Sequence, residues 1–260
     1  TSSFMTVGMG SLGTIRVNND AGSQANAIDD ITPHAYNETW DGLSVTNISF
    51  FGNQTTEGSI DYRIPAQEYM GTTINASVTY DPSSGNAAPA KAGVTAASGG
   101  TGTAYTLQLA HESGLEIGGG IEQLSSNHVS IATSKIQDEN RNTAYIKYAI
   151  GGLSAAYQES YQDSLASTAG TATEGADLEA SYLGVAYTAG NVTVSYAEGE
   201  LETKAVSNTV ALATEEQKST QIAYTMGAMT LSAAISTADN VAGTAARKYE
   251  ENTLAVSFAF

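Results

Sequence analysis

The connections between the strand-like segments of this chain alternate strictly between short and long, and this limits the possible folds more than any other feature of the sequence. Thirteen segments can be marked as strands. The short connections lie near 10–12, 65–71, 114, 151–152, 189–191 and 227–228, and the long ones span about 19–58, 81–102, 127–142, 164–176, 201–216 and 240–251. An up-and-down β-barrel, with tight turns at one end and extended loops at the other, produces this order directly. A Greek-key sandwich would mix the two lengths.

Within the strand-like segments, apolar side chains occupy every second position, which is the period of a β-strand. In 73–80 the apolar face is Ile74, Ala76, Val78 and Tyr80, and the pattern recurs in 192–196, 221–226, 229–236 and 253–260. The other face consists mainly of Thr, Ser, Gly, Ala, Asn and Gln. Such a face suits the wall of a water-filled lumen, and the apolar face suits a band in contact with lipid. A soluble sandwich would instead turn polar, often charged, faces to bulk water.

Composition supports an all-β chain and excludes several other classes. The chain is rich in Gly (26) and Tyr (14), has 4 Pro, and lacks cysteine, so it has no disulfide framework and no thiolate metal site. Its 27 acidic and 10 basic residues give a net charge of -17, which argues against a nucleic-acid partner. No unbroken apolar run of about 18 residues is present, so no transmembrane helix is expected.

Strand parity predicts that part of the barrel wall is absent from this sequence. Thirteen antiparallel strands leave the first and last running in the same direction, so these two strands cannot close a barrel with antiparallel pairing. The chain also begins inside an apparent strand at 4–9. We therefore expect a transmembrane antiparallel β-barrel of sixteen strands, of which residues 1–260, as a single domain, form the fourth to the sixteenth.

Three places in the sequence carry a family resemblance. The hairpin 4–18, which ends Gly-Ser-Leu-Gly-Thr-Ile-Arg-Val-Asn, resembles the G-x-[FL]-G-T-[IV]-x-[IVL]-x hairpin of the trimeric general porins of Gram-negative outer membranes, especially the alphaproteobacterial ones. The segment 59–65, Ser-Ile-Asp-Tyr-Arg-Ile-Pro, is similar to the strand that follows the long third loop in that family. The terminal Phe260 matches the aromatic residue that the barrel-assembly machinery reads. Leu12 and Asn18 depart from the usual Phe and Gly.

The resemblance implies a function as well as a fold. It implies a homotrimeric, non-enzymatic diffusion channel for small hydrophilic solutes and ions, without a cofactor, located in the bacterial cell outer membrane. Its partners would include membrane lipids and lipopolysaccharide. An alternative is a solute-specific outer-membrane channel with a weak binding site at the constriction loop. A third alternative is a structural or adhesive surface β protein without a pore.

The resemblance further implies a constriction loop at 19–58 that folds into the lumen and sets acidic groups opposite basic groups of the wall. The acidic candidates on this loop are Asp29, Asp30, Glu38 and Asp41. Alternation with outward-facing neighbours predicts that Arg16 and Arg63 point inward and form the basic wall. Alternatively, the acidic residues begin a solvated loop and the arginines lie at the rim. The lone Trp40 would either brace the loop against the wall or fill a small core within the loop.

The same alternation predicts that Lys147, Glu116 and Glu122 line the pore, because each is flanked by apolar residues that would face outward. A Lys or Arg that faced lipid at the bilayer midplane would destabilise the barrel by about 2–4 kcal/mol. A charge in the lumen tunes ion selectivity without forming a catalytic site.

Other polar groups allow further chemistry in principle. Carboxylates near the outer ends of strands could bind Ca²⁺ in the loops or bridge through divalent ions to lipopolysaccharide phosphates; they are Asp138 with Glu139, Glu198 with Glu200 and Glu202, and Glu215 with Glu216. Solvated loop charge is the simpler alternative, since no EF-hand spacing is present. The histidines His34, His111 and His128 lie in different segments with no nucleophile motif, so we expect no hydrolase site.

Overall fold

The structure is a computed structural model that describes residues 3–19, 23–41, 43, 58–82, 101–129, 136–163, 177–204 and 212–259. Its strands are β1 (Ser3–Gly8), β2 (Thr14–Asn19), β3 (Ile60–Arg63), β4 (Gln67–Tyr69), β5 (Thr72–Asp81), β6 (Thr101–His111), β7 (Leu115–Val129), β8 (Ile136–Ile150), β9 (Leu153–Asp163), β10 (Asp177–Ala189), β11 (Val192–Lys204), β12 (Glu215–Met226), β13 (Met229–Asp239) and β14 (Lys248–Phe258). Short 3₁₀ turns lie at Gly10–Leu12, Asn26–Ile28 and Val241–Gly243. No helix in the described ranges is long and apolar enough to cross a membrane.

All strands belong to one antiparallel sheet in which neighbours in sequence are neighbours in space. The hydrogen-bonded path runs from β1 to β14 and leaves out only β4, which pairs with the beginning of β5 while β3 pairs with its end. β3 and β4 are thus two halves of one strand, interrupted around Pro65, which lacks the N–H that a ladder needs. The prediction of an all-β meander with thirteen strand positions is confirmed.

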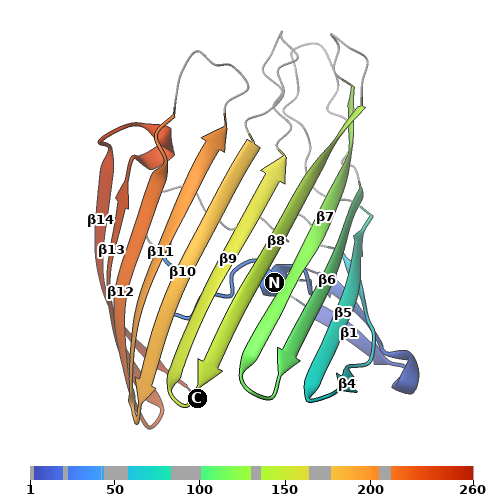
Figure 1. The fold of residues 1–260 in the computed structure, drawn as a ribbon, viewed down its shortest axis with the longest axis horizontal. Coiled ribbons are helices and arrows are strands. Elements are labelled where there is room, and N and C mark those ends of the chain that lie inside the picture. Colours follow the sequence, from blue (N-terminus) through green and yellow to red (C-terminus); the bar gives the residue numbers. More distant parts are fainter. Residues whose placement is uncertain are drawn as a thin grey trace.

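Short and long connections alternate as predicted, and the tight turns gather at one end of the sheet (Figure 1). The structure corrects three loop boundaries. The connections expected at 127–142, 201–216 and 240–251 shorten to 130–135, 205–214 and 240–247. Sequence reasoning ended these strands too early because their outer ends carry polar residues on both faces. The backbone ladder continues there regardless, for example between Glu200 and Glu216.

The distribution of polar and apolar side chains in the sheet is the reverse of that in a soluble protein. The largest fully buried side chains of the described residues are mostly polar: Gln158, Gln217, Glu122, Glu215, Asn18, Thr79, Asp61 and Asp81, with Ile28 the apolar member. The exposed large side chains are apolar and come from the alternate positions of the same strands, among them Leu107, Ile117, Ile146, Leu183, Val194, Ile222, Leu231 and Val256. A protein that folds in water buries its large apolar side chains. An exposed apolar face that continues across the strands therefore indicates contact with another apolar phase.

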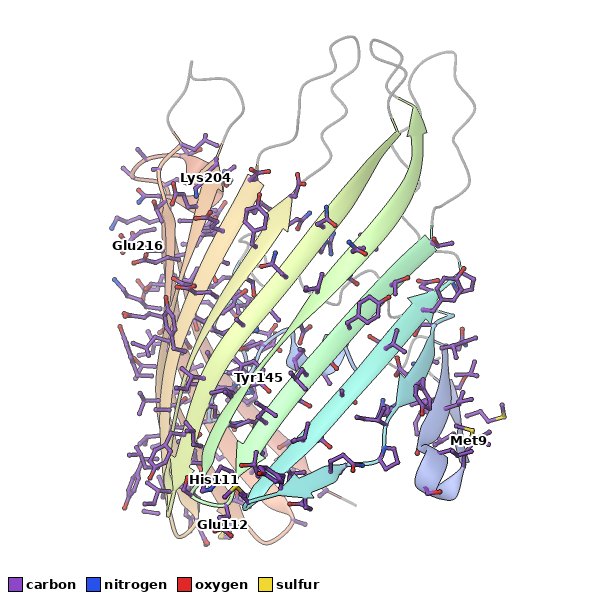
Figure 2. All side chains as sticks on the ribbon, turned by 45° about the vertical axis from the view of Figure 1, so that its right-hand side comes forward. Met9, His111, Glu112, Tyr145, Lys204 and Glu216 are labelled. Atoms are coloured by element: carbon purple, nitrogen blue, oxygen red, sulfur yellow. The ribbon has the colours of Figure 1, made fainter. Side chains whose placement is uncertain are left out.

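The sheet curves, and loop 23–41 crosses its polar, concave side at about mid-height (Figure 1). We call this side the inner face and the opposite, apolar side the outer face. Figure 2 gives the axial order: His111 and Glu112 lie at the end with the tight turns, Tyr145 lies further up, and Lys204 and Glu216 lie at the other end.

Candidate functional site

Loop 23–41 is held at its base by the carboxylate of Asp61, which is fully buried on the inner face of β3. Asp61 Oδ2 accepts hydrogen bonds from Asn18 Nδ2 at 3.0 Å and from the backbone N–H of Gln24 at 3.2 Å. Thr79 Oγ1 donates to Oδ1 at 2.6 Å, and Arg63 Nη2 pairs with Oδ2 at 3.2 Å. One carboxylate thus joins β2, β3 and β5 to the start of the loop.

The loop then crosses β9, where Gln158 binds its backbone. The Gln158 amide nitrogen donates to the carbonyl oxygens of Ile28 at 3.0 Å and Asp29 at 3.1 Å, and also contacts Thr143 Oγ1 at 2.7 Å. The Gln158 amide oxygen accepts the N–H of Ile31 at 3.0 Å. A fully buried side chain therefore satisfies loop backbone groups that have no ladder partner.

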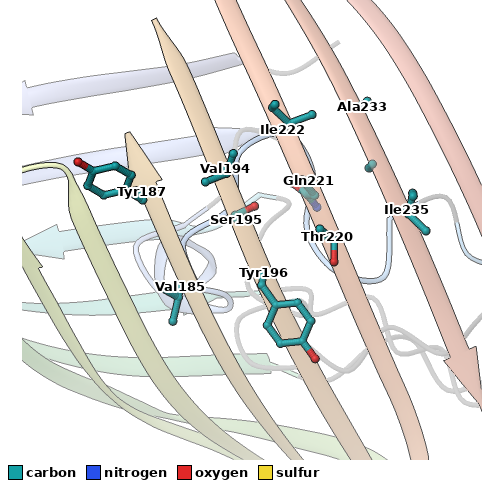
Figure 3. A pocket seen from close by; sticks show the side chains of 11 residues that line it. Val185, Tyr187, Val194, Ser195, Tyr196, Thr220, Gln221, Ile222, Ala233 and Ile235 are labelled. Carbon is teal, nitrogen blue, oxygen red and sulfur yellow. The ribbon is translucent and has the colours of Figure 1, made fainter. Parts of the chain in front are cut away.

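Further along, the loop binds β11 and β12 in the same way. Ser195 Oγ accepts the N–H of Ala35 at 2.9 Å. Gln221 Oε1 accepts the N–H groups of Tyr36 at 2.8 Å and Asn37 at 3.2 Å, and Gln221 Nε2 donates to the Asn37 carbonyl at 2.6 Å. Figure 3 shows Ser195 and Gln221 on neighbouring strands with the loop passing behind them.

Two small apolar clusters complete the docking. Near the base, Ala25 and Ile28 pack with Ala104 of β6 and Tyr145 of β8, with Ile31 beside them. At the far end, buried Trp40 packs against β10 and β11, with its ring centroid 5.6 Å from that of Tyr182, and the rest of this cluster is Ala180, Leu201 and Leu178. Of the two alternatives for Trp40, bracing against the wall is the one observed.

Carboxylates gather on the loop itself. Burial raises the pKa of Asp29 to about 7, and the adjacent Asp30 carboxylate adds to the increase. Burial likewise raises the pKa of Glu38 to about 7, with further contributions from Asp30, Asp29 and Asp41. These side chains are half-buried except that of Asp41, which is exposed.

Asp30 forms a local turn with Thr32. Its Oδ1 accepts the N–H of Thr32 at 2.8 Å and the Thr32 hydroxyl at 2.7 Å. Burial raises the pKa of Asp30, whereas these hydrogen bonds and the nearby His34 lower it. Asp30 thus shapes the turn in which the loop passes over β10.

The two predicted basic residues of the wall lie on the inner face of the neighbouring strands β2 and β3. The loop acids instead lie near β9–β12, on which their part of the loop docks. Arg16 on β2 is the cross-strand partner of Asp61, and its guanidinium carbon lies 4.1 Å from the centre of the Phe4 ring. Arg63 forms its ion pair with Asp61 on the same strand. The structure therefore brings Arg16 and Arg63 together around Asp61.

The predicted lining residues of β7 and β8 also lie on the inner face. Glu116 accepts the Tyr145 hydroxyl at 2.6 Å and lies opposite Lys147 in the strand register. Glu122 is fully buried and lies 3.9 Å from Arg141. In the described strands, inward-facing cations thus come from β2, β3 and β8. The lysines of β11, β12 and β14, namely Lys204, Lys218 and Lys248, lie on the outer face.

The remaining acidic candidates divide between the two faces. Glu198, Glu200, Glu202 and Glu216 alternate with buried inner residues and face outward, whereas Glu215 is buried and accepts the N–H of Ala242 at 2.8 Å. Among the described residues, no group of three potential ligands could hold a metal ion. The side chains of Asp138, Glu139 and His128, and all of Phe260, lie outside the described part.

The two histidines with described side chains, His34 and His111, do not form a common site with each other. His34 lies on the loop, where Nδ1 is 3.1 Å from the Thr32 carbonyl oxygen. His111 lies in the turn after β6, where its Nδ1 contacts the hydroxyl of Ser113 at 2.8 Å and the N–H of Ser113 at 3.1 Å. This geometry closes a local, exposed turn.

Comparison with known proteins identifies the fold. No family model matches the chain, and no curated protein matches it. Among solved structures, a porin refined at 1.8 Å resolution superposes with a TM-score of 0.65 at 17% sequence identity, with 96% of this chain and 79% of that chain covered. The chain has a porin fold. The outer membrane channel DcaP of Acinetobacter baumannii also superposes on the chain, with a TM-score of 0.62 at 11% identity over 96% of this chain and 74% of that chain.

Within this porin fold, sequence reasoning missed the residues that hold the loop. Asp61 follows from the alternation that had already predicted Arg63 to face inward, so its direction was available in the sequence. Gln158 and Gln221 lie on inward positions, but nothing local distinguishes them from other polar inner residues. Their partners lie 127 to 185 residues away along the chain, so only the tertiary structure reveals them.

Proposed function

We propose that this chain forms a passive channel of the bacterial outer membrane for small hydrophilic solutes and ions. The observation that carries the proposal is the inverted sheet, with polar side chains buried on the concave face and large apolar side chains exposed on the convex face. Such a sheet is stable where lipid surrounds it and water fills it. A loop across the concave face is then a constriction, and the proposal includes no catalytic activity.

The charges around this loop support a field across the pore. The loop acids Asp29, Asp30, Glu38 and Asp41 lie on a stretch that docks on β9–β12, where the contacting side chains, Gln158, Ser195 and Gln221, are neutral. The inward-facing cations lie on β2, β3 and β8, and they are Arg16, Arg63, Arg141 and Lys147. We take the first group as the acidic side of the constriction and the second, with Glu116 and Glu122 beside it, as the mixed wall.

Reconstitution in planar lipid bilayers tests the function. The folded protein should give stepwise ion currents that rise linearly with voltage and with salt concentration. The reversal potential in a salt gradient then reports the ion preference. A full-length protein that is folded and inserted, as judged by heat-modifiable migration on gels, but that carries no current would exclude a channel.

The alternative of a solute-specific channel makes a different prediction in the same experiment. Binding at loop 23–41 would make solute flux saturate and would let the solute block the ion current. A homotrimer, contacts with lipopolysaccharide through the outward carboxylates of β10–β12, loop-bound Ca²⁺, and recognition of Phe260 by the barrel-assembly machinery belong to the same proposal. Native mass spectrometry, with and without a chelator and lipopolysaccharide, tests the first three.

A further inference from the structure

We propose that Gln158 and Gln221 are positioning residues that set the width of the pore by holding loop 23–41 against β9 and β12. The inference rests on the proposed channel function and deepens it. The two side chains come from different strands and bind two separate stretches of the loop, 28–31 and 36–37. The loop segment between them is therefore fixed at both ends.

Each glutamine binds the loop with both the NH₂ group and the carbonyl oxygen of its side-chain amide. Gln158 donates to two loop carbonyls and accepts one loop N–H, and Gln221 donates to one loop carbonyl and accepts two loop N–H groups. Glutamine suits this task because it is both donor and acceptor and carries no charge. A carboxylate at either place could only accept, and it would add a charge close to the loop acids.

The part of the wall between the two glutamines lets the loop approach the backbone of the sheet closely. Gly184 of β10 lies beneath Thr32 and Pro33, and a Cβ at Gly184 would lie 2.9 Å from Thr32 Cβ and 3.1 Å from Pro33 Cδ. Ser195 of β11 binds Ala35 in the same stretch. The four strands β9, β10, β11 and β12 thus meet the loop in order, with the glutamines at the two outer positions.

The loop depends on these side chains because it has no strand neighbour there. Without the two amides, the N–H groups of Ile31, Tyr36 and Asn37 lose the partners that the structure gives them. A buried backbone group without a hydrogen-bond partner destabilises the docked conformation of the loop. In a water-filled lumen, these N–H groups can bind water instead if the loop leaves the wall. The loop would then move off the wall and change the open cross-section.

The first experiment compares single-channel conductance and solute exclusion of the wild type with the double variant Gln158→Ala, Gln221→Ala. We expect conductance to change by about twofold, with more open-channel noise, because pore dimensions control conduction. The control is Thr225→Ala on the inner face of β12, whose hydroxyl lies 3.1 Å from that of Thr230 near the turn end of the sheet. Unchanged conductance in the folded double variant overturns the inference, as does an equal change in the control.

A cross-link provides a test that does not require the glutamines to be removed. The chain has no cysteine, and the Ala35 N–H bonds Ser195 Oγ at 2.9 Å, so Ala35→Cys with Ser195→Cys is the pair chosen for a single cross-link between the loop and β11. When only the cysteine pair is introduced, its oxidation should leave the conductance at the wild-type value, because the loop already lies beside β11. In the double glutamine variant that carries the same cysteine pair, oxidation should restore that conductance. A large change on oxidation in the wild-type background would contradict the proposed loop position.

The outcomes also separate this inference from the proposed function. If the folded wild type carries no current in bilayers, the channel itself is excluded. If the wild type conducts and neither the double variant nor the cross-link behaves as expected, only the positioning role of Gln158 and Gln221 is excluded.

Discussion

The side-chain amide of Asn18 donates a hydrogen bond of 3.0 Å to the carboxylate of Asp61, and both side chains are buried at the base of the loop. Their strands are adjacent in the sheet but 43 residues apart in sequence. The same carboxylate holds the first turn of the loop through Gln24. The start of the loop is therefore tied to the wall by one acidic side chain.

Asp61→Asn should lower the free energy of unfolding by about 2–3 kcal/mol, because hydrogen bonds to a charged acceptor are lost and an amide N–H₂ faces donors. Urea unfolding of the detergent-refolded protein measures this loss. Asp41→Asn is the control, since Asp41 is exposed on the same loop. Equal stability of the two variants would contradict the role of Asp61.

Gly184→Ala should displace the loop from β10, because the added Cβ overlaps Thr32 and Pro33. Overpacking of this kind lowers stability by about 1–3 kcal/mol. Gly8→Ala is the matched substitution, since a Cβ at Gly8 meets no atom within 4 Å. A comparison of the free energies of unfolding of the two variants checks this prediction. A larger loss of stability in Gly8→Ala than in Gly184→Ala would refute it.

Trp40 is the only tryptophan of the chain, so its fluorescence reports whether the loop is docked. The buried ring beside Tyr182 and Leu201 should emit at short wavelength and resist quenching by acrylamide. Leu201→Ala opens this cluster and should shift the emission to longer wavelength. Val194→Ala, on the outer face of the same strand, should leave the emission unchanged.

The charge of the loop should change near neutral pH. Burial raises the pKa of both Asp29 and Glu38 to about 7, so negative charge builds up as pH rises through that value. Cation preference, measured from the reversal potential in a KCl gradient, should increase between about pH 6 and 8. The double variant Asp29→Asn, Glu38→Gln should flatten this increase, and an unaltered pH profile would argue against these two groups.

The same two carboxyls predict how loop docking depends on pH. Their pKa values in the docked state exceed the ordinary values of 3.8 for aspartate and 4.5 for glutamate, so the docked loop binds more protons than the undocked one. Docking is therefore most stable at low pH and weakens as pH rises from about 4 through about 7. Trp40 quenching, followed across this range, should become easier with rising pH.

The outer face of β12 should not tolerate charge if it meets lipid. Ile222→Lys places an ammonium on the exposed apolar face and should destabilise the folded protein in bilayers by about 2–4 kcal/mol. Thr225→Lys on the inner face of the same strand, near the turn end, should have little effect. A reversed order of the two variants would contradict the assignment of the faces.

The number of strand positions, the alternation of turns and loops, and the inward direction of Arg16, Arg63, Glu116, Glu122 and Lys147 were all available in the sequence. Each follows from a local rule, because successive side chains of a strand point to opposite faces whatever the rest of the chain does. The strand ends were predicted less well. Their acidic residues suggested loops, whereas backbone pairing, which is indifferent to side-chain polarity, continues the ladder.

Only the tertiary structure decided the path of the loop. Its contacts join Asp61, Gln158 and Gln221 to loop backbone groups far away in the sequence, and no local period encodes such pairs. The sequence therefore determined the wall through its two-residue period, and the fold determined the path of the loop by bringing distant hydrogen-bonding groups together.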